Sequence, residues 1–99
     1  MDKEFDYVIV GAGSAGCVLA NKLSEDGKST VLLIEAGGKD TNLFIHMPSG
    51  YSQIVPETNN QNYGFETEPE ETTSGRKMYW PRGRGWGGSS SINAMIYIR

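Results

Sequence analysis

Two short apolar runs separated by a glycine-rich turn place the strongest limit on how this chain can fold. Tyr7–Val10 and Val31–Ile34 are continuous apolar runs rich in β-branched residues, as in strands buried on both faces of a parallel sheet. Between them, apolar residues recur at helical spacing over Ala15–Leu23, and Gly27 follows as a stop signal. This order predicts an α/β fold that begins with a parallel strand–helix–strand unit over residues 1–38.

The turn between the first strand and the helix has the pattern G-x-G-x-x-G. Gly11 permits a tight turn, Gly13 lets the backbone approach a pyrophosphate, and Gly16 lets helix and strand pack closely. The phosphates would lie at the helix N-terminus, where Ser14 is the next residue. Glu35 ends the second strand nineteen residues after Gly16 and can accept hydrogen bonds from a ribose hydroxyl pair. The pattern predicts a Rossmann-like dinucleotide site, with both NAD and FAD possible at this point.

The middle of the chain carries weaker signals. Ala36 and the two glycines after it form a plain turn or bring bare backbone near an adenine. Residues 39–81 read as a connecting segment, with a short helix after Pro48. Within it, 62–80 is predicted to form a hairpin whose return arm is Lys77–Trp80, because a turn signal separates two strand-like stretches.

Composition excludes several functional classes. A formal net charge of −3 gives no reason to expect a nucleic-acid partner. The single cysteine, Cys17, excludes an internal disulfide and is typical of a reducing compartment. His46 is the only histidine, so it offers no catalytic pair and is interpreted as structural or exposed, and no metal site is predicted. The acidic start is not a signal peptide and no apolar run is long enough to span a membrane, so we expect a cytoplasmic protein, with peripheral membrane association left open.

A second glycine-rich stretch closes the chain and carries a resemblance to a known family. The segments FDYVIVGAGSAG, IEAGG, IHMPSG, NYGFETEPE and above all YWPRGRGWGGSSSINAMIYIR resemble the glucose-methanol-choline (GMC) family of flavin oxidoreductases. The resemblance covers almost the whole chain and implies FAD rather than NAD. The positions that match the family's second cofactor segment are Arg82, Gly83, Gly87, Gly88, Ser89, Ser90 and Asn93.

The resemblance also implies a role for each part of the chain. Residues 1–99 would be the N-terminal portion of the FAD-binding domain, with a dinucleotide fingerprint over 1–38, a connecting segment over 39–81 and a second FAD-contact motif over 82–99. The three fingerprint glycines would hold the FAD pyrophosphate and Glu35 the adenosine ribose. Ile92 stands where some members carry a histidine bonded to the flavin, so non-covalent FAD is expected.

Within the family, the greatest similarity is to members that oxidise choline. This implies hydride transfer from the alcohol carbon to FAD, an aldehyde product and an electron acceptor in a respiratory membrane. The family's catalytic histidine pair lies near the C-terminus of much longer chains and matches nothing here, so a fragment without its catalytic and substrate domain is expected. The expected activity is that of an FAD-dependent alcohol dehydrogenase, with this fragment alone inactive, and the sequence leaves oxidase chemistry open. The alternatives are another primary alcohol as substrate, a non-catalytic nucleotide-binding remnant or unfolded truncation product, and an NAD-dependent dehydrogenase.

Overall fold

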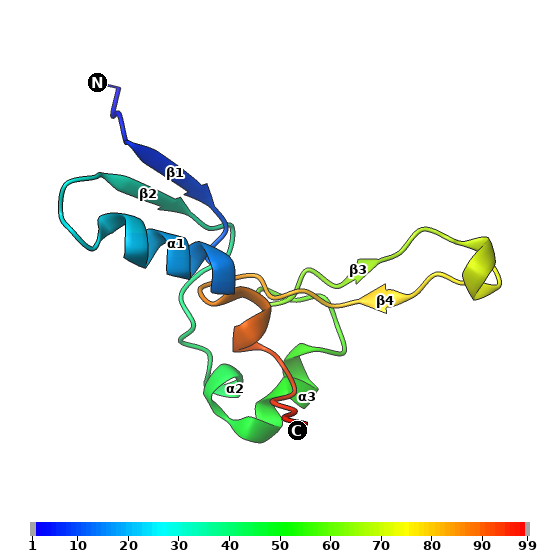
Figure 1. Ribbon diagram of the computed structural model, residues 1–99. Coiled ribbons are helices and arrows are strands. Elements are labelled where there is room, and N and C mark those ends of the chain that lie inside the picture. Colours follow the sequence, from blue (N-terminus) through cyan, green and yellow to red (C-terminus); the bar gives the residue numbers. More distant parts are fainter. Residues whose placement is uncertain (1, 99) are drawn as a thin grey trace.

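The computed structural model of the protein describes residues 2–98, which form a βαβ body, a helical lobe and a long arm (Figure 1). The body and the arm each contain a separate two-stranded sheet. In chain order the elements are strand β1 (Tyr7–Val10), helix α1 (Ser14–Ser24), strand β2 (Val31–Ile34), helices α2 (Leu43–His46) and α3 (Tyr51–Ile54), and strands β3 (Phe65–Glu66) and β4 (Tyr79–Trp80). Short 3-10 turns occur at Pro48–Gly50, Glu71–Thr73 and Gly88–Ser91.

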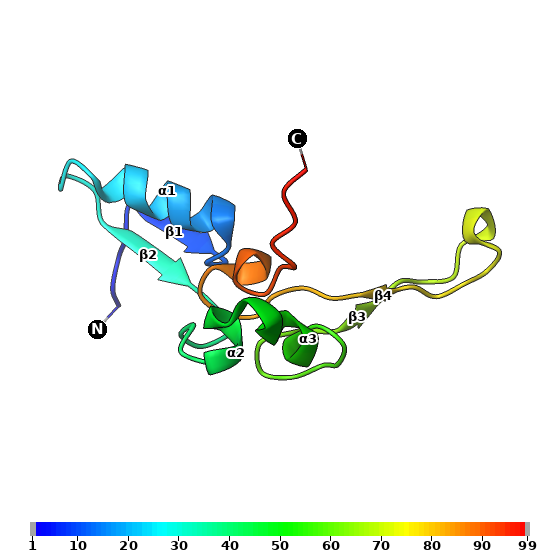
Figure 2. The ribbon, with the colours of Figure 1, turned by 90° about the horizontal axis from the view of Figure 1, so that it is seen from below.

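The βαβ body has the predicted topology. Strands β1 and β2 pair in parallel, with Ile9 opposite Leu33. Helix α1 lies across one face of this pair (Figures 1 and 2). It packs closely on the first turn because Gly16 has no side chain, and a Cβ there would overlap the carbonyl oxygen of Gly11. The predicted parallel unit and the bounds of both strands are therefore confirmed.

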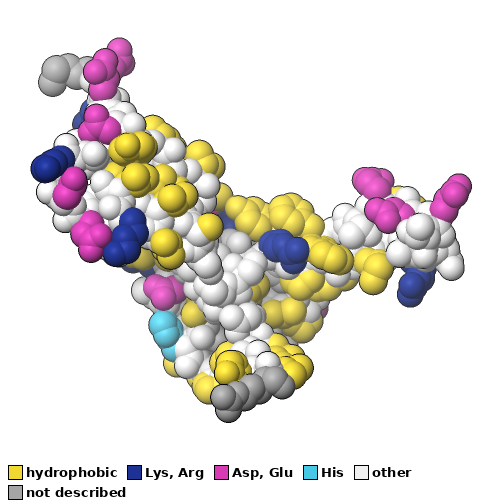
Figure 3. Space-filling view, viewed as in Figure 1, with side chains coloured by type: hydrophobic (Ala, Val, Ile, Leu, Met, Phe, Trp, Pro, Cys, Tyr) yellow, Lys and Arg dark blue, Asp and Glu magenta, His cyan; other side chains and the backbone are white. Residues whose placement is uncertain are grey.

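The prediction that these strands are buried on both faces is wrong for the described residues. Ile9 is 9% exposed, but Val8 is 56% and Val10 is 82% exposed. Burial on both faces requires a covering layer on each side of the sheet. In residues 2–98, α1 covers one face only, and several apolar patches are visible over the body (Figure 3).

The helical lobe follows the body. Asn42 caps α2, because its side-chain oxygen accepts a hydrogen bond from Phe44 N at 2.8 Å. Pro48 begins the next 3-10 turn, where its missing N–H costs nothing. The short helix predicted after Pro48 is present as this turn and α3, whereas α2 is an addition to the prediction. His46 is exposed and its ring contacts the carbonyl of Asp40, in agreement with a structural or surface role.

The arm is the predicted hairpin. Phe65 pairs with Trp80 and Glu66 with Tyr79 in an antiparallel ladder, which is shorter than the expected return arm. The rings of Tyr63 and Phe65 stack on one another, with centroids 4.9 Å apart. Figures 1 and 2 both show the arm reaching away from the body, so its aromatic face stays exposed.

The described residues contain neither a long apolar helix nor a cluster of metal ligands. No helix within residues 2–98 is long and apolar enough to cross a lipid bilayer. The same stretch holds no group of three or more histidine, cysteine or acidic side chains that could bind a metal ion. Glycine-rich backbone lies where α1 contacts the last 3-10 turn.

Candidate cofactor site

The two glycine-rich segments lie against each other in the structure. The amide of Gly87 donates a hydrogen bond to the carbonyl of Ala12 at 2.7 Å. Next to it, a Cβ on Gly88 would stand only 2.9 Å from the Cα of Gly13. The structure therefore brings together two segments that are more than seventy residues apart in the chain.

The backbone of the first segment is open where a dinucleotide needs it to be. A Cβ built on Gly13 would meet no atom within 4 Å, so the space in front of this residue is free. Helix α1 starts at Ser14 with no side-chain cap and no acidic residue in its first turn. The N-terminal amides of α1 are thus left free by its own side chains, which suits a pyrophosphate. These residues fit the phosphate portion of FAD.

Glu35 lies directly behind the glycine turn. Its Oε2 accepts a hydrogen bond from Ala12 N at 2.8 Å, and its Oε1 accepts one from Gly37 N at 2.9 Å. Each carboxylate oxygen has a second lone pair. The half-buried carboxylate can therefore also accept hydrogen bonds from a ribose hydroxyl pair.

The backbone around Glu35 keeps it ionised. Burial raises the pKa of this carboxyl, but the hydrogen bonds from Ala12 N and Gly37 N, with smaller contributions from the nearby amides of Gly85 and Ala36, outweigh burial and hold the pKa below its ordinary value of 4.5. The negative charge that Glu35 carries at neutral pH repels a 2′-phosphate, so the site favours a cofactor with a free ribose.

The second segment folds back on itself. The amide of Gly83 donates to Ser89 Oγ at 3.0 Å, and a Cβ on Gly83 would overlap the carbonyl oxygen of Gly88. The hydroxyl of Ser90 donates to Gly87 O. The segment is a closed loop with little side-chain bulk, held by its own backbone and hydroxyl groups.

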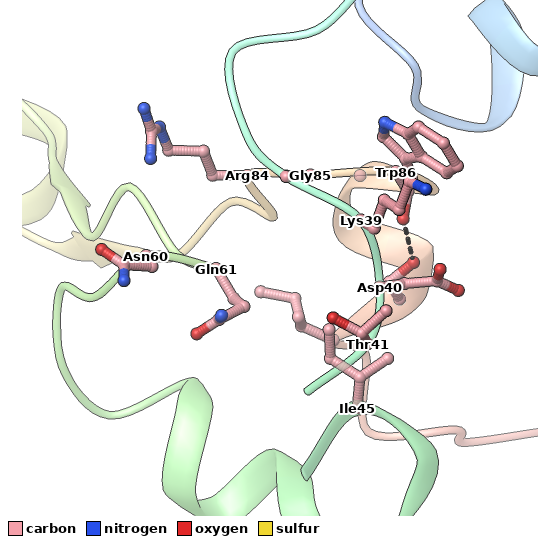
Figure 4. Close-up of a pocket in the computed structure, with 13 residues that line it drawn as sticks. Lys39, Asp40, Thr41, Ile45, Asn60, Gln61, Arg84, Gly85 and Trp86 are labelled. Carbon is pink, nitrogen blue, oxygen red and sulfur yellow. Dashed lines mark hydrogen bonds between the residues drawn. The ribbon is translucent and has the colours of Figure 1, made fainter. Parts of the chain in front are cut away.

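A cavity of about 350 Å³ lies beside this loop (Figure 4). Its walls come from the chain after β2, from Asn60 and Gln61, and from the loop around Trp86. The Lys39 ammonium lies 5.4 Å from the centre of the Trp86 ring, and the two side chains close one side of the cavity. The cavity therefore borders the second segment without opening on Gly13, which is absent from its lining.

Not every predicted site residue turns toward the glycine turn. The Arg82 guanidinium lies 5.1 Å from the centre of the Trp80 ring and donates to Pro81 O, on the arm. Asn93 is exposed; its amide nitrogen donates to Ser90 O and its oxygen accepts from Met95 N. The side chains of Arg82 and Asn93 therefore point away from the glycine turn. The second segment is held together by hydrogen bonds or contacts of Gly83, Ser89 and Ser90. The other predicted site residues lie around the junction of the two segments: Gly11, Gly13, Ser14, Gly16, Glu35, Ala36, Gly87 and Gly88.

No site role is predicted from the sequence for Ala12 or Asn62, and Gly37 is left open between a plain turn and backbone near an adenine. Ala12 donates its N–H to Glu35 and accepts a hydrogen bond from Gly87 N at its carbonyl oxygen. Because both bonds are made by the backbone, the identity of its side chain does not mark this role in the sequence. Gly37 donates to Glu35, and a Cβ on it would overlap the peptide between Arg84 and Gly85. Asn62 is fully buried, although it stands in a polar stretch typical of an exposed loop. Of these three residues, only Gly37 is marked by a sequence signal, because it belongs to the glycine pair that follows Glu35 and Ala36.

Comparison with known proteins assigns this arrangement to a family. The family model described as GMC oxidoreductase matches residues 5–99. The chain is 55% identical over 95 residues to "Alcohol dehydrogenase [acceptor]" of Pseudomonas putida, covering 96% of this chain and 17% of that protein. It is 52% identical over 101 residues to "Oxygen-dependent choline dehydrogenase" of Vibrio vulnificus, covering 100% of this chain and 18% of that protein.

Solved structures give the same result. Pyridoxine 4-oxidase from Mesorbium loti superposes with a TM-score of 0.83 at 45% identity, over 97% of this chain and 18% of the other. A formate oxidase superposes with a TM-score of 0.76 at 33% identity, over 90% of this chain and 16% of the other. The chain thus spans less than a fifth of the length of these relatives.

Proposed function

Because the chain belongs to the GMC oxidoreductase family of FAD-binding flavoproteins, we propose that its two glycine-rich segments hold FAD as the N-terminal part of a flavin-dependent alcohol oxidoreductase. The observation that carries this proposal is the contact between Gly13 and Gly88 beside Glu35. A dinucleotide lying along this junction would have bare backbone on two sides, a helix N-terminus at its phosphates and a carboxylate at its ribose.

Each part of the chain has a binding role in this proposal. Gly13 and the first turn of α1 receive the pyrophosphate, because their amide groups are free of side-chain caps. Glu35 accepts the ribose hydroxyls. An apolar hollow of about 330 Å³ beside Glu35, walled partly by Leu33 and Trp86, leaves room for a nucleoside. The remaining proposed contacts, toward the flavin end and along the loop, are Gly11, Gly16, Ala36, Arg82, Gly83, Gly87, Gly88, Ser89, Ser90 and Asn93.

The chain contributes binding and orientation. FAD, when bound, supplies the hydride acceptor for oxidation of an alcohol to an aldehyde. Glu35 fixes the orientation of the adenosine portion, and the closed loop from Gly83 to Ser90 excludes water from the phosphates by covering them with backbone. His46 is exposed, and its ring contacts the carbonyl oxygen of Asp40. We therefore assign no catalytic base among residues 2–98.

Choline is the proposed substrate. This rests on 50–52% identity to proteins named choline dehydrogenase, and the 55% identity to a bacterial alcohol dehydrogenase makes another primary alcohol the second candidate. The two are separated by kcat/KM of the full-length polypeptide for choline and for uncharged primary alcohols of similar size. A preference for the uncharged alcohols contradicts the choline assignment. Comparing oxygen with a quinone analogue in the same assay tests the proposed respiratory electron acceptor.

FAD binding itself is tested by titration. Adding FAD to the flavin-free polypeptide is expected to quench flavin fluorescence and to raise the melting temperature, since a ligand of the native state stabilises it. NAD serves as the matched control, because it also carries adenosine and a pyrophosphate. A larger shift with NAD than with FAD contradicts the proposed cofactor.

A further inference from the structure

Asn62 is a buried polar side chain that the binding roles above do not use. It has an exposed fraction of 0% and lies at the base of the arm. Its side-chain nitrogen is within hydrogen-bonding distance of four acceptors, which are Ile54 O at 3.1 Å, Val55 O at 3.0 Å, Glu57 O at 3.1 Å and Tyr79 Oη at 2.9 Å. The two N–H groups of the amide are thus shared among the end of α3 and strand β4.

The other end of the same side chain reaches the second cofactor segment. Asn62 Oδ1 accepts hydrogen bonds from Gly64 N at 2.9 Å and from Arg82 N at 3.2 Å. The backbone repeats this connection, because Asn62 forms a β-bridge with Gly83 and Tyr63 N donates to Arg82 O at 2.9 Å. Asn62 therefore connects α3 to the residues where the second segment begins.

From there the connection runs to the glycine turn through close contacts. Gly83 N is bonded to Ser89 Oγ, and a Cβ on Gly83 would overlap Gly88 O. Gly88 in turn lies against Gly13. Because Gly83 packs directly on the backbone of Gly88, and Gly88 on that of Gly13, a shift of the chain at Gly83 is passed to Gly13 through backbone contacts as well as through the Ser89 hydroxyl.

We propose that Asn62 is a positioning residue that sets the placement of the second segment against Gly13, and thereby the affinity for FAD. The inference rests on the proposed function, since it assumes that this segment binds the cofactor. The side chain is suited to the task because an amide both donates and accepts. Aspartate in its place would set a carboxylate against the Ile54 and Val55 carbonyls. An apolar residue would leave Arg82 N without its acceptor and would remove one of the two side-chain donors from each of those carbonyls, which keep Asn59 and Tyr79.

The first experiment compares two variants that disturb different bonds of the Asn62 cluster, which is Asn62 with its hydrogen-bond partners Ile54, Val55, Glu57, Gly64, Tyr79 and Arg82. Asn62→Leu removes the bond to Arg82 N, whereas Tyr79→Phe removes one acceptor of the Asn62 amide and leaves the Oδ1 bonds in place. Both are expected to lower the melting temperature. At a temperature where both are folded, Asn62→Leu should raise the FAD dissociation constant about tenfold or more, while Tyr79→Phe leaves it unchanged. Equal FAD affinity in the two variants overturns the proposal.

The second experiment needs no variant and uses reciprocity. If Asn62 couples its cluster to FAD binding, then FAD must stabilise that cluster by the same free energy. Amide hydrogen exchange of the full-length polypeptide should therefore slow at Gly64, whose N–H donates to Asn62 and lies outside the cofactor segments. Gly75, which donates to Glu70 O at 2.8 Å at the tip of the arm, is the control and should not change.

The outcomes distinguish this inference from the proposed function. Slower amide exchange at Gly64 and at the glycine turn supports both FAD binding and the role of Asn62. Slower exchange over Gly11–Gly16 with no change at Gly64 overturns the role of Asn62 and leaves FAD binding intact. No slowing at either place overturns the proposed function and this inference with it.

Discussion

Gly88 packs on Gly13, with the position of a Cβ on Gly88 only 2.9 Å from the Gly13 Cα. Gly88 also has a φ of 59°, a left-handed conformation that favours glycine. The pair therefore joins the two halves of the site by contact between bare backbones. The two glycines differ in one respect, because a side chain on Gly13 would point into open space and one on Gly88 would not.

Gly13→Ala is expected to separate folding from cofactor binding. The added methyl meets no protein atom within 4 Å, and the φ of −79° and ψ of −169° suit alanine. Stability should fall by about 1 kcal/mol, the usual cost of placing alanine at a helix N-cap. The methyl would occupy the space proposed for the pyrophosphate, so FAD affinity should fall by about 1–3 kcal/mol, roughly 5- to 150-fold. Unchanged FAD affinity in a folded variant contradicts the placement of the phosphates.

Gly16→Ala is expected to act on folding instead. A Cβ there overlaps the carbonyl of Gly11, which is backbone and cannot turn away. The helix must move from the strand at a cost of about 2 kcal/mol or more, which exceeds the gain of up to about 1 kcal/mol that alanine brings to a helix. Urea unfolding measures the difference, and Gly38→Ala is the control because its Cβ meets nothing within 4 Å. A loss no larger than that of the control would show that α1 is not held as described.

The body of the fold could be predicted because its signals are local. The apolar run Tyr7–Val10, the helical spacing before Gly27 and the small residue at Gly16 each act within one or two turns of chain. Glu35 follows from the same pattern, since it ends the strand that lies beside the first. The meeting of Gly13 with Gly88 is not local, and only the resemblance to a family pointed to it.

Burial could not be predicted at two informative positions. Asn62 reads as part of an exposed polar loop, yet contacts with α3, with Tyr79 and with the chain at Arg82 enclose it completely. Val10 reads as core, yet it is 82% exposed in the described residues. In both cases burial is decided by segments distant in the chain, which carry no periodic signal at the position itself.

Glu35→Gln is expected to weaken both stability and FAD binding. The amide nitrogen of glutamine would face one of the two backbone amides, Ala12 N or Gly37 N, which now donate to the carboxylate. Leaving one such donor unpaired costs about 1–3 kcal/mol. Denaturant unfolding and FAD titration measure the two effects. The control is Glu25→Gln, which removes an exposed ion pair with Lys22 at 3.2 Å and should cost less than about 1 kcal/mol.

The flavin is expected to be held without a covalent bond. Ile92, which is 6% exposed and packed within the second segment, has no nucleophilic atom to form one. Acid precipitation of the flavin-loaded full-length polypeptide should leave the flavin in the supernatant. A yellow pellet that persists after washing contradicts this expectation. Free FAD mixed with the same polypeptide after precipitation is the control for trapped cofactor.

The response of stability to acid should depend on two carboxyl groups, of which one also affects FAD. The Thr30 amide and hydroxyl, both bonded to Asp6 Oδ2, lower the pKa of Asp6 from its ordinary 3.8, and the pKa of Glu35 lies below 4.5. Both pKa values are lower in the folded state than in the unfolded state. Both groups therefore stabilise the fold at every pH above their unfolded-state pKa. This contribution is lost as the pH falls through the folded values.

Unfolding free energy measured between pH 7 and pH 3 should therefore be level near neutrality and fall below about pH 4.5. Asp6→Asn should reduce that slope and leave the pH dependence of FAD affinity unchanged, because Asp6 bonds to Thr30 at the opposite end of the strands from the glycine turn. Glu35→Gln should reduce both. An unaltered acid slope in Glu35→Gln would mean that its carboxylate is not held by the backbone amides, and an altered FAD profile in Asp6→Asn would place the effect of pH outside the site.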